Sequence, residues 1–251
     1  MVAPSEDAPP VQGKEKRKER KEPRVPKEQG ANRFVWRMRY APAKPVDGYV
    51  AAESALAGPV AAPGTYEVRL TVGDATYSET FTIDKDPRVV ATQADLEEQL
   101  ALRLKMRDKL SETHDAVNMI RNIRQQVEDW ERRTQEREEH ESITKLGKSL
   151  KEKLSTIENE LIQSKAKSRQ DTLNFPAKLN AKLAALSGAI ASADAAPTRQ
   201  QYELFEDLVA RIDVQLKRLQ EVMETDVVSF NKLIRELDVP ALVPTTSLFT
   251  Q

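Results

Sequence analysis

The amino-acid sequence predicts a mainly helical α+β protein, in which a small, partial β-sandwich precedes an antiparallel up-and-down four-helix bundle. Two patterns support this prediction. Between residues 32 and 83, apolar and polar residues alternate, as is typical of half-buried strands. From residue 96 onward, apolar residues recur at steps of three and four, as is typical of amphipathic helices. Short connections between the helical stretches favour antiparallel neighbours.

The charge balance and the absence of cysteine exclude several classes of function. The 251 residues include 39 Lys and Arg against 40 Asp and Glu, so no overall field steers the chain toward nucleic acid or membrane. Without cysteine there is no disulfide, no thiolate metal site and no cysteine nucleophile. No apolar run approaches the roughly 20 residues that cross a bilayer, so we expect no membrane span.

Four segments are expected along the chain. Residues 1–29 are predicted to form a disordered charged tail, 30–88 the sandwich, 92–238 the helical bundle and 239–251 a flexible C-terminal tail. The first segment, Met1 to Gly30, lacks the apolar core of a signal peptide.

The first strand is predicted at Asn32–Tyr40. Phe34, Trp36 and Met38 alternate there with polar or smaller residues and give one apolar face. We expect Trp36 to anchor the sandwich core. The Ala- and Pro-rich stretch Ala41–Ala62 follows, and it either contributes another strand or leaves the sandwich with strands missing upstream.

A β-hairpin is predicted between residues 63 and 83. Its arms share one apolar face, made of Tyr66, Val68, Leu70, Val72, Tyr77, Phe81 and Ile83. Two connections keep these residues on one side: a two-residue type II′ turn at Gly73–Asp74, or a four-residue loop to Thr76 that pairs Val68 with Phe81. We favour the longer loop, because the shorter turn sets Val68 opposite Glu79.

Helix starts are marked by two capping signatures, Thr92 with Asp95 and Thr198 with Gln201. The first helix is expected to extend to about residue 138 and the last to about residue 237. The apolar side of the last helix drifts at Val227–Val228, which predicts a bend there.

Breaks in the apolar pattern define the connections. The polar stretch between Trp130 and Ile143 predicts an exposed reversal, after which a second apolar stripe continues to residue 161. Asp171–Pro176 ends that helix because proline disfavours a helical residue before it. A short third helix is expected at about residues 177–192, before a further break at Asp194–Pro197.

Ser111, His114 and Asp115 lie within one helical turn and mimic a hydrolytic triad. A triad needs an oxyanion site beside its serine. Because a regular helix interior offers no free backbone N–H groups, we interpret His114 as a solvated or bundle-facing histidine.

Two other clusters resemble metal sites. His140 lies in the predicted tip among three acidic residues, Glu138, Glu139 and Glu141. A single imidazole makes a poor metal site, and we interpret the cluster as a solvated tip. Asp84 and Asp86 have the spacing of a small calcium turn but too few oxygen ligands, so we expect a turn at the domain junction.

The remaining features are also interpreted as structural. Glutamates on the long helices are expected to form ion-paired faces, because glycosidase chemistry needs two carboxyls across a sugar-sized cleft. The basic run Lys14–Lys27 lacks aromatic residues on which bases stack.

Trp130 is expected to cap the first helix stripe, whereas an exposed Trp130 would indicate a partner surface. No catalytic, cofactor-binding or metal-binding residue is assigned.

Five motifs occur in the same order as in a known group of proteins. They are Gly30–Trp36, Pro63–Leu70, Asp86–Arg88, Ser111–Val117 and Leu173–Asn180, the last followed by Pro197–Thr198. Together they resemble the C-terminal immunoglobulin-like and helical region of large bacterial exported proteins. These are the sortilin-like, BNR-repeat propeller proteins often labelled glycosyl hydrolases.

The resemblance spans about residues 30–238 and has clear departures. The propeller, which would carry any hydrolase site, has no counterpart in the sequence. A charged run replaces the strands expected before Asn32, and Arg37 follows Trp36 where an acidic residue is expected.

Together with the lack of catalytic groups in the sequence, the resemblance implies a non-catalytic accessory or interaction module, without a cofactor, that docks on a β-propeller domain or protein. It also implies an extracellular or periplasmic location. Two alternatives remain open. One is a remnant hydrolase with residual activity, and the other is weak, salt-sensitive binding of nucleic acid or an anionic surface through the basic tail.

Overall fold

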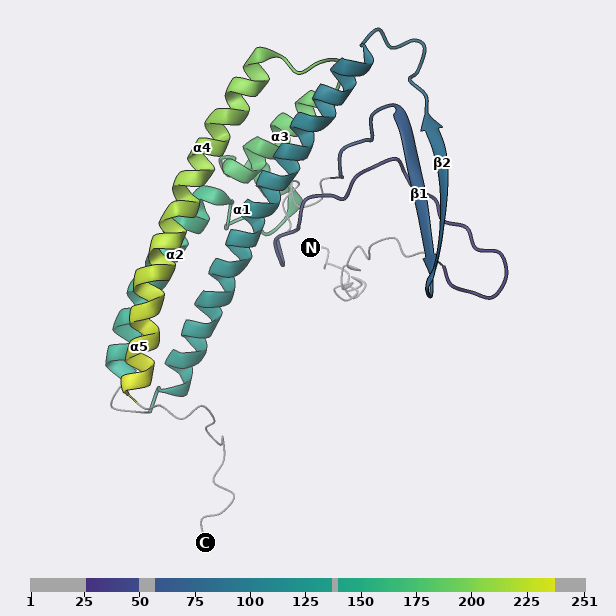
Figure 1. Cartoon of the computed structure of the whole chain (residues 1–251). Coiled ribbons are helices and arrows are strands. Elements are labelled where there is room, and N and C mark those ends of the chain that lie inside the picture. The colour runs from purple at the N-terminus through teal and green to yellow at the C-terminus, as the bar shows by residue number, and fades with distance from the viewer. Residues whose placement is uncertain (1–25, 50–56, 137–139, 238–251) are drawn as a thin grey trace, which may run out of the picture. The chain divides into compact units, whose positions relative to one another are not determined.

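The computed structural model describes residues 26–49, 57–136 and 140–237 (Figure 1). The protein is mainly helical with a small antiparallel sheet, as the sequence predicts. The sheet consists of β1 (Gly64–Val72) and β2 (Ala75–Ile83). The helical elements are α1 (Gln93–Arg133), α2 (His140–Leu161), the 3₁₀ turn η2 (Arg169–Leu173), α3 (Leu179–Ile190), α4 (Arg199–Val222), the π-helical turn η3 (Met223–Val227) and α5 (Val228–Glu236).

The chain divides into two units, residues 1–37 and 38–251. The hairpin and all the helices belong to the second unit. The segment boundaries expected from the sequence, at residues 29, 88 and 238, therefore stay a prediction.

The predicted strand at Asn32–Tyr40 is wrong. Met38 has a φ of 51°, a left-handed conformation that interrupts an extended run. Trp36 is 38 % exposed, so the expectation that it anchors a core is also wrong. An alternating pattern alone does not make a strand where the backbone finds no continuous partner for its hydrogen bonds.

In the described parts of 32–40 and 41–62, which leave out residues 50–56, the β pairing is limited to an isolated bridge. Arg39 pairs with Val60 in an antiparallel bridge, and the Tyr40 amide donates to the Pro59 carbonyl over 2.9 Å. The two segments approach so closely that a Cβ on Gly58 would lie 1.8 Å from the Tyr40 carbonyl oxygen. Only glycine permits this pairing.

The hairpin uses the two-residue turn, so the prediction of a four-residue loop is wrong. Gly73 has a φ of 59°, as the first position of a type II′ turn requires, and Val68 lies opposite Glu79. A carboxylate opposite Val68 would be unfavourable on a buried face. The apolar face instead stays open, with Val68 54 % exposed, so the carboxylate keeps its water. On the same face the Tyr66 and Phe81 rings stack with centroids 5.9 Å apart.

Both helix starts are as predicted. Thr92 accepts a hydrogen bond from the Asp95 amide while the Asp95 carboxylate accepts one from the Thr92 amide. Thr198 and Gln201 make the same reciprocal pair at the start of α4. These capping boxes satisfy amides that have no partner within the helix.

The predicted reversal between Trp130 and Ile143 is confirmed. Helix α1 ends at Arg133, about one turn earlier than expected, and the buried Thr134 hydroxyl donates to the Trp130 carbonyl over 2.9 Å at this end. Helix α2 begins at His140 and carries the second apolar stripe into the core.

One aliphatic core joins the helices. Helix α1 contacts α2, α3 and α4, and α2 in turn contacts α4 and α5 (Figure 1). The completely buried residues of this core include Val117, Ile120, Ile143, Leu154, Leu161, Ile162, Leu183 and Ile212. Helices α1 and α2 approach closely at Gly147, where a Cβ would lie 2.8 Å from a Val127 methyl group.

The last helix contains one wide turn. Five residues, Met223–Val227, form the π-helical turn η3 between α4 and α5. It lies directly at the position where the apolar pattern drifts in the sequence. A π-helical turn accommodates one extra residue, so the apolar side is brought back into line rather than lost.

Candidate functional site

The three residues that mimic a hydrolytic triad all contact Lys44. The Ser111 hydroxyl accepts from the Lys44 amide over 3.2 Å and donates to the Arg107 carbonyl over 2.8 Å. His114, only 1 % exposed, has Nδ1 2.6 Å from the Lys44 carbonyl oxygen, and the Asp115 carboxylate forms a 2.6 Å ion pair with Lys44 Nζ. Because a carbonyl only accepts, Nδ1 carries the proton.

These contacts differ from those of a serine–histidine–aspartate catalytic relay. In a relay the serine donates to the histidine, and the aspartate orients the other ring nitrogen. Here Ser111 donates to its own helix, and Asp115 binds an ammonium group. The three side chains hold a neighbouring segment of the chain.

That segment, Ala43–Asp47, is called the strap below. The same face of α1 continues to bind it one and two turns further on. Asn118 donates to the Pro45 carbonyl over 3.1 Å and accepts from the Asp47 amide over 3.0 Å. Arg121 donates to the Asp47 carbonyl over 2.7 Å. The strap thus satisfies its backbone groups on α1.

An apolar anchor fixes the strap as well. Val46 is 2 % exposed and belongs to the helical core, as does Tyr49. Polar residues at steps of three and four along α1 therefore bind the strap backbone, while its one large apolar side chain is buried.

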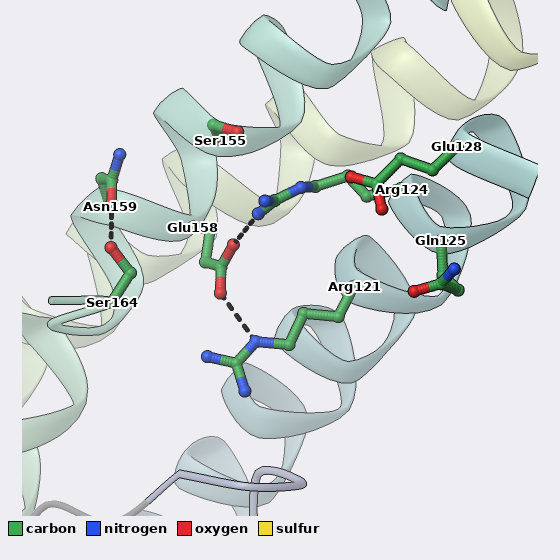
Figure 2. A pocket seen from close by; sticks show the side chains of 8 residues that line it. All are labelled: Arg121, Arg124, Gln125, Glu128, Ser155, Glu158, Asn159 and Ser164. Atoms are coloured by element: carbon green, nitrogen blue, oxygen red, sulfur yellow. Dashed lines mark hydrogen bonds and ion pairs between the residues drawn. The ribbon is translucent and has the colours of Figure 1, made fainter. Parts of the chain in front are cut away.

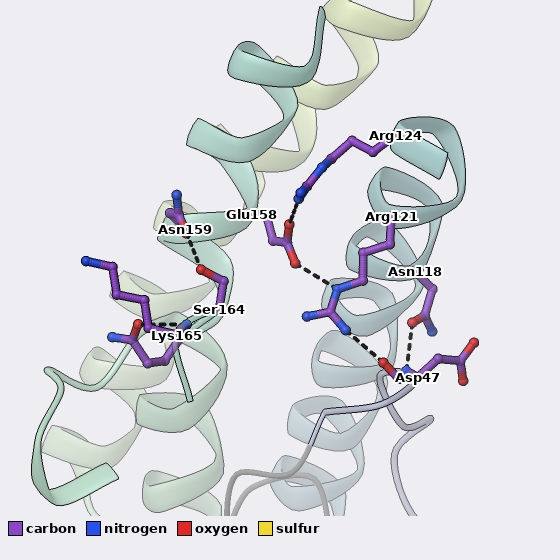
Figure 3. A network of polar contacts seen from close by, with 9 residues as sticks. Asp47, Asn118, Arg121, Arg124, Glu158, Asn159, Ser164 and Lys165 are labelled. Carbon is purple, nitrogen blue, oxygen red and sulfur yellow. Dashed lines mark hydrogen bonds and ion pairs between the residues drawn. The ribbon is translucent and has the colours of Figure 1, made fainter. Parts of the chain in front are cut away.

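Arg121 also takes part in a second cluster, in which two guanidinium groups bind one buried carboxylate (Figure 2). Arg121 Nε lies 2.7 Å from Glu158 Oε1, and Arg124 Nη1 lies 2.6 Å from Glu158 Oε2. Glu158 on α2 is 2 % exposed. Figure 3 shows how Arg121 reaches from Glu158 to Asp47 and so joins α2, α1 and the strap.

An open pocket of about 520 Å³ lies at this cluster, between α1 and α2 (Figure 2). It is lined by polar side chains: Arg121, Arg124, Gln125, Glu128, Ser155, Glu158, Asn159 and Ser164. Both of its serines are engaged, since Ser155 donates to the Lys151 carbonyl and Ser164 to Asn159 Oδ1. The pocket can offer N–H donors to a polar group, but its lining places no nucleophile beside a base.

His140 joins the end of α1 to the start of α2. Its Nδ1 lies 3.4 Å from the Thr134 hydroxyl and its Nε2 lies 3.2 Å from the Thr144 hydroxyl. The ring is half-buried, so the expectation of a solvated histidine is only partly correct. Glu138 and Glu139 lie outside the described residues.

Asp86 stabilises a turn after β2. Its carboxylate accepts from the Arg88 amide over 2.9 Å and forms a 2.6 Å ion pair with the Arg88 guanidinium group. Asp84 is exposed, and no ion pair joins it to another of the described residues. Within residues 26–49, 57–136 and 140–237, no three His, Asp or Glu side chains gather as metal ligands would.

The remaining features singled out in the sequence are Trp130, the basic run and the expected lack of a membrane span. Trp130 is partly buried against the core, and the Arg133 guanidinium lies 4.4 Å from its ring centroid, which fits the interpretation as a cap. Lys14–Lys27 lies almost entirely outside the described part of the chain. Among the helices that the structure describes, none has the length and apolar character of a membrane span.

Sequence reasoning missed Glu158 and the strap. Glu158 follows Leu154 by four residues, which places it on the apolar side of α2, and this spacing was the available signal. The helical glutamates were instead expected to form exposed ion-paired faces. No pattern in the strap itself predicts that it binds α1, because its contacts involve mainly backbone atoms.

No family model, curated protein or solved structure matches this chain. The resemblance to sortilin-like propeller proteins therefore remains an expectation from the sequence.

Proposed function

We propose that this chain is a non-catalytic accessory module that acts through protein–protein contact. One observation carries the proposal: Ser111, His114 and Asp115 bind the strap, so the most enzyme-like group of residues has a structural role. The polar pocket beside Glu158 likewise lacks a nucleophile next to a base.

We further propose that the helices form an up-and-down four-helix bundle, with η3 and α5 continuing α4. The contacts of α1 with α2 and of α3 with α4 support this arrangement, as does the single aliphatic core. Such a bundle would give the module a rigid arm.

The hairpin is proposed to be part of an immunoglobulin-like sandwich that a partner completes. A two-stranded hairpin is marginal in water unless its apolar face is covered. Here the face remains exposed at five large side chains, Val68, Leu70, Val72, Tyr77 and Phe81. The proposed partner is a β-propeller domain or protein, and the proposed location is extracellular or periplasmic. Both rest on the sequence resemblance.

The experiment is a pull-down with the full chain as bait, followed by identification of propeller proteins among the captured species. Leu70→Asp places a charge on the apolar face, and we expect it to abolish the capture. Thr80→Asp places the same charge on the opposite face of the hairpin and should retain it, because β1 and β2 alternate their faces. Equal capture by both variants would contradict docking through this face.

A second arm tests the non-catalytic assignment. The purified chain is incubated with glycoside, ester and peptide substrates, beside Ser111→Ala. We expect no turnover by either protein. Hydrolysis by the purified chain that is lost in Ser111→Ala would overturn the proposal.

A further inference from the structure

A second, smaller cavity lies on another part of α1. Its volume is about 60 Å³, and it is bounded by the strap end at Ala43, by Pro59, and by side chains of α1 and α3. The lining is mostly apolar and includes Met106 and Leu183. Arg103 provides a guanidinium group there. This volume is far below the roughly 300–1,000 Å³ of a pocket for a drug-sized ligand.

Among the residues that the structure describes, no acidic side chain balances the charge of Arg103. Its Nε is buried and has no hydrogen-bond partner, and no described carboxylate forms an ion pair with it. Burial lowers the pKa of Arg103, and the positive charge of Arg39 lowers it further. Arg107 also lines the cavity, but it pairs with Asp108 at 2.6 Å.

Proteins seldom leave a partly buried charge in this state, because an unpaired polar group removed from water is costly. Neutralisation by a bound anion removes the cost. A carboxylate suits a guanidinium group better than a spherical ion does, since it accepts two parallel N–H bonds. The apolar lining favours a ligand that also carries a short hydrocarbon chain.

We propose that this cavity binds a small aliphatic carboxylate, with its oxygens on Arg103 and its chain against Met106 and Leu183. The small volume selects against sugars and nucleotides. The site is separate from the strap contacts and from the Glu158 pocket, and it does not depend on the accessory function proposed above.

The test is thermal unfolding of the full chain with propionate, at an ionic strength matched with chloride. We expect Tm to rise by a few degrees at saturating propionate, because a ligand that binds only the folded state stabilises it. Arg103→Met should lose this rise. Without ligand, that variant should melt no lower than the unchanged protein, because the substitution removes an unbalanced charge.

Two further variants complete the design. Arg211→Met removes an exposed arginine of α4 that pairs with Asp207, so it should keep the full propionate response. Gly188→Ala adds a methyl group at the cavity wall, where a Cβ meets no atom within 4 Å, so it should fold and respond less. The proposal is overturned by the absence of any propionate response. It is also overturned by a response that Arg103→Met retains, or by an equal response to inorganic phosphate.

Discussion

Glu158 shows how much one buried side chain can determine. It lies on the apolar side of α2, and burial of a lone carboxylate there would be prohibitive. Two guanidinium groups of α1, each about one-third exposed, bind its two oxygens. The arrangement fixes the register of α1 against α2, since a shift by one residue would separate the charges. Specificity of packing is the best-supported role for such a buried pair.

We expect Glu158→Gln to destabilise the protein by about 2–4 kcal/mol, because it leaves two guanidinium groups without a counter-charge. Because both arginines are partly exposed to water, which screens their charge, we expect a loss of stability in the lower half of this range. Urea unfolding measures the change. Glu160→Gln, which removes an exposed partner of Lys178, is the control and should cost less than about 1 kcal/mol. Equal effects of the two variants would refute the buried-pair argument.

Tyr202 provides a second prediction for a single side chain. Its hydroxyl donates to Glu98 over 2.8 Å. Burial, together with this hydrogen bond and the charge of Glu98, raises the pKa of Tyr202 to about 12. The unfolded chain has a tyrosine pKa near 10. The contribution to stability is therefore complete below about pH 10 and is lost as pH rises toward 12.

Phenolate absorbance during an alkaline titration measures the pKa of Tyr202. The difference between the unchanged chain and Tyr202→Phe should show one tyrosine that ionises near pH 12. The Tyr202→Phe protein should also lose less stability than the unchanged chain between pH 10 and 12. A difference spectrum with its midpoint near pH 10 would argue against the contact with Glu98.

At the scale of elements, local chemistry decided what could be predicted. The starts of α1 and α4 follow from capping boxes that lie within four residues of sequence. The end of α2 was predicted less well: the helix ends at Leu161, ten residues before the expected break at Asp171–Pro176, and Arg169–Leu173 forms the 3₁₀ turn η2. The strand register of the hairpin depends on whether other residues pack over its apolar face, and so does strand formation at Asn32–Tyr40. No local sequence pattern contains that information.

The candidate site also has one part that the sequence predicts and one part that it does not. That Ser111 and His114 lie on one helical turn was predictable from spacing. Their partner was not, because Lys44 is almost 70 residues away and contributes mainly backbone atoms. Long-range contacts of this kind leave no periodic signal in the sequence.

The two helical glycines allow a matched test of helix packing. A Cβ on Gly147 would lie 2.8 Å from the Val127 methyl group and 2.7 Å from Glu131 Oε1. Val127 is buried and has little freedom to move. We expect Gly147→Ala to cost about 1–2 kcal/mol, since overpacking outweighs the gain of roughly 1 kcal/mol in helix propensity.

Gly188→Ala is the control, because its Cβ meets no atom within 4 Å. It should raise Tm slightly through the same gain in propensity. Thermal unfolding of both variants makes the comparison. If Gly147→Ala were as stabilising as Gly188→Ala, the close approach of α1 and α2 would be wrong.

For the molecule as a whole, the strap connects the irregular segment before the hairpin to the core of the helices. Arg121 binds both the strap and Glu158, so the strap and the contact between α1 and α2 share one side chain. The two contacts use different nitrogens of Arg121, so the bond to Glu158 can persist when the bond to Asp47 is lost. Release of the strap's polar contacts should be a local opening that leaves the helical core folded.

Asn118→Ala tests this by removing both strap contacts of one side chain. We expect faster amide hydrogen exchange at Asp47, with a change in global stability below about 1 kcal/mol. Asn122, one turn further on, accepts from Gln126, and Asn122→Ala should leave the Asp47 amide protected. Faster exchange throughout α1 would mean that the strap contact is essential to the fold.

The wide turn η3 has a consequence for how the last helix tolerates change. In a regular helix of about 100° per residue, Phe230 would be rotated roughly 80° from Val222. The one additional residue in Met223–Val227 brings both to the buried side. The number of residues in this turn, rather than their chemistry, thus sets the orientation of α5. Exposed positions there should accept many substitutions, whereas deletion of Thr225 should expose Phe230 and detach α5 from α2. Length at this point should therefore matter more to the packing of α5 than composition does.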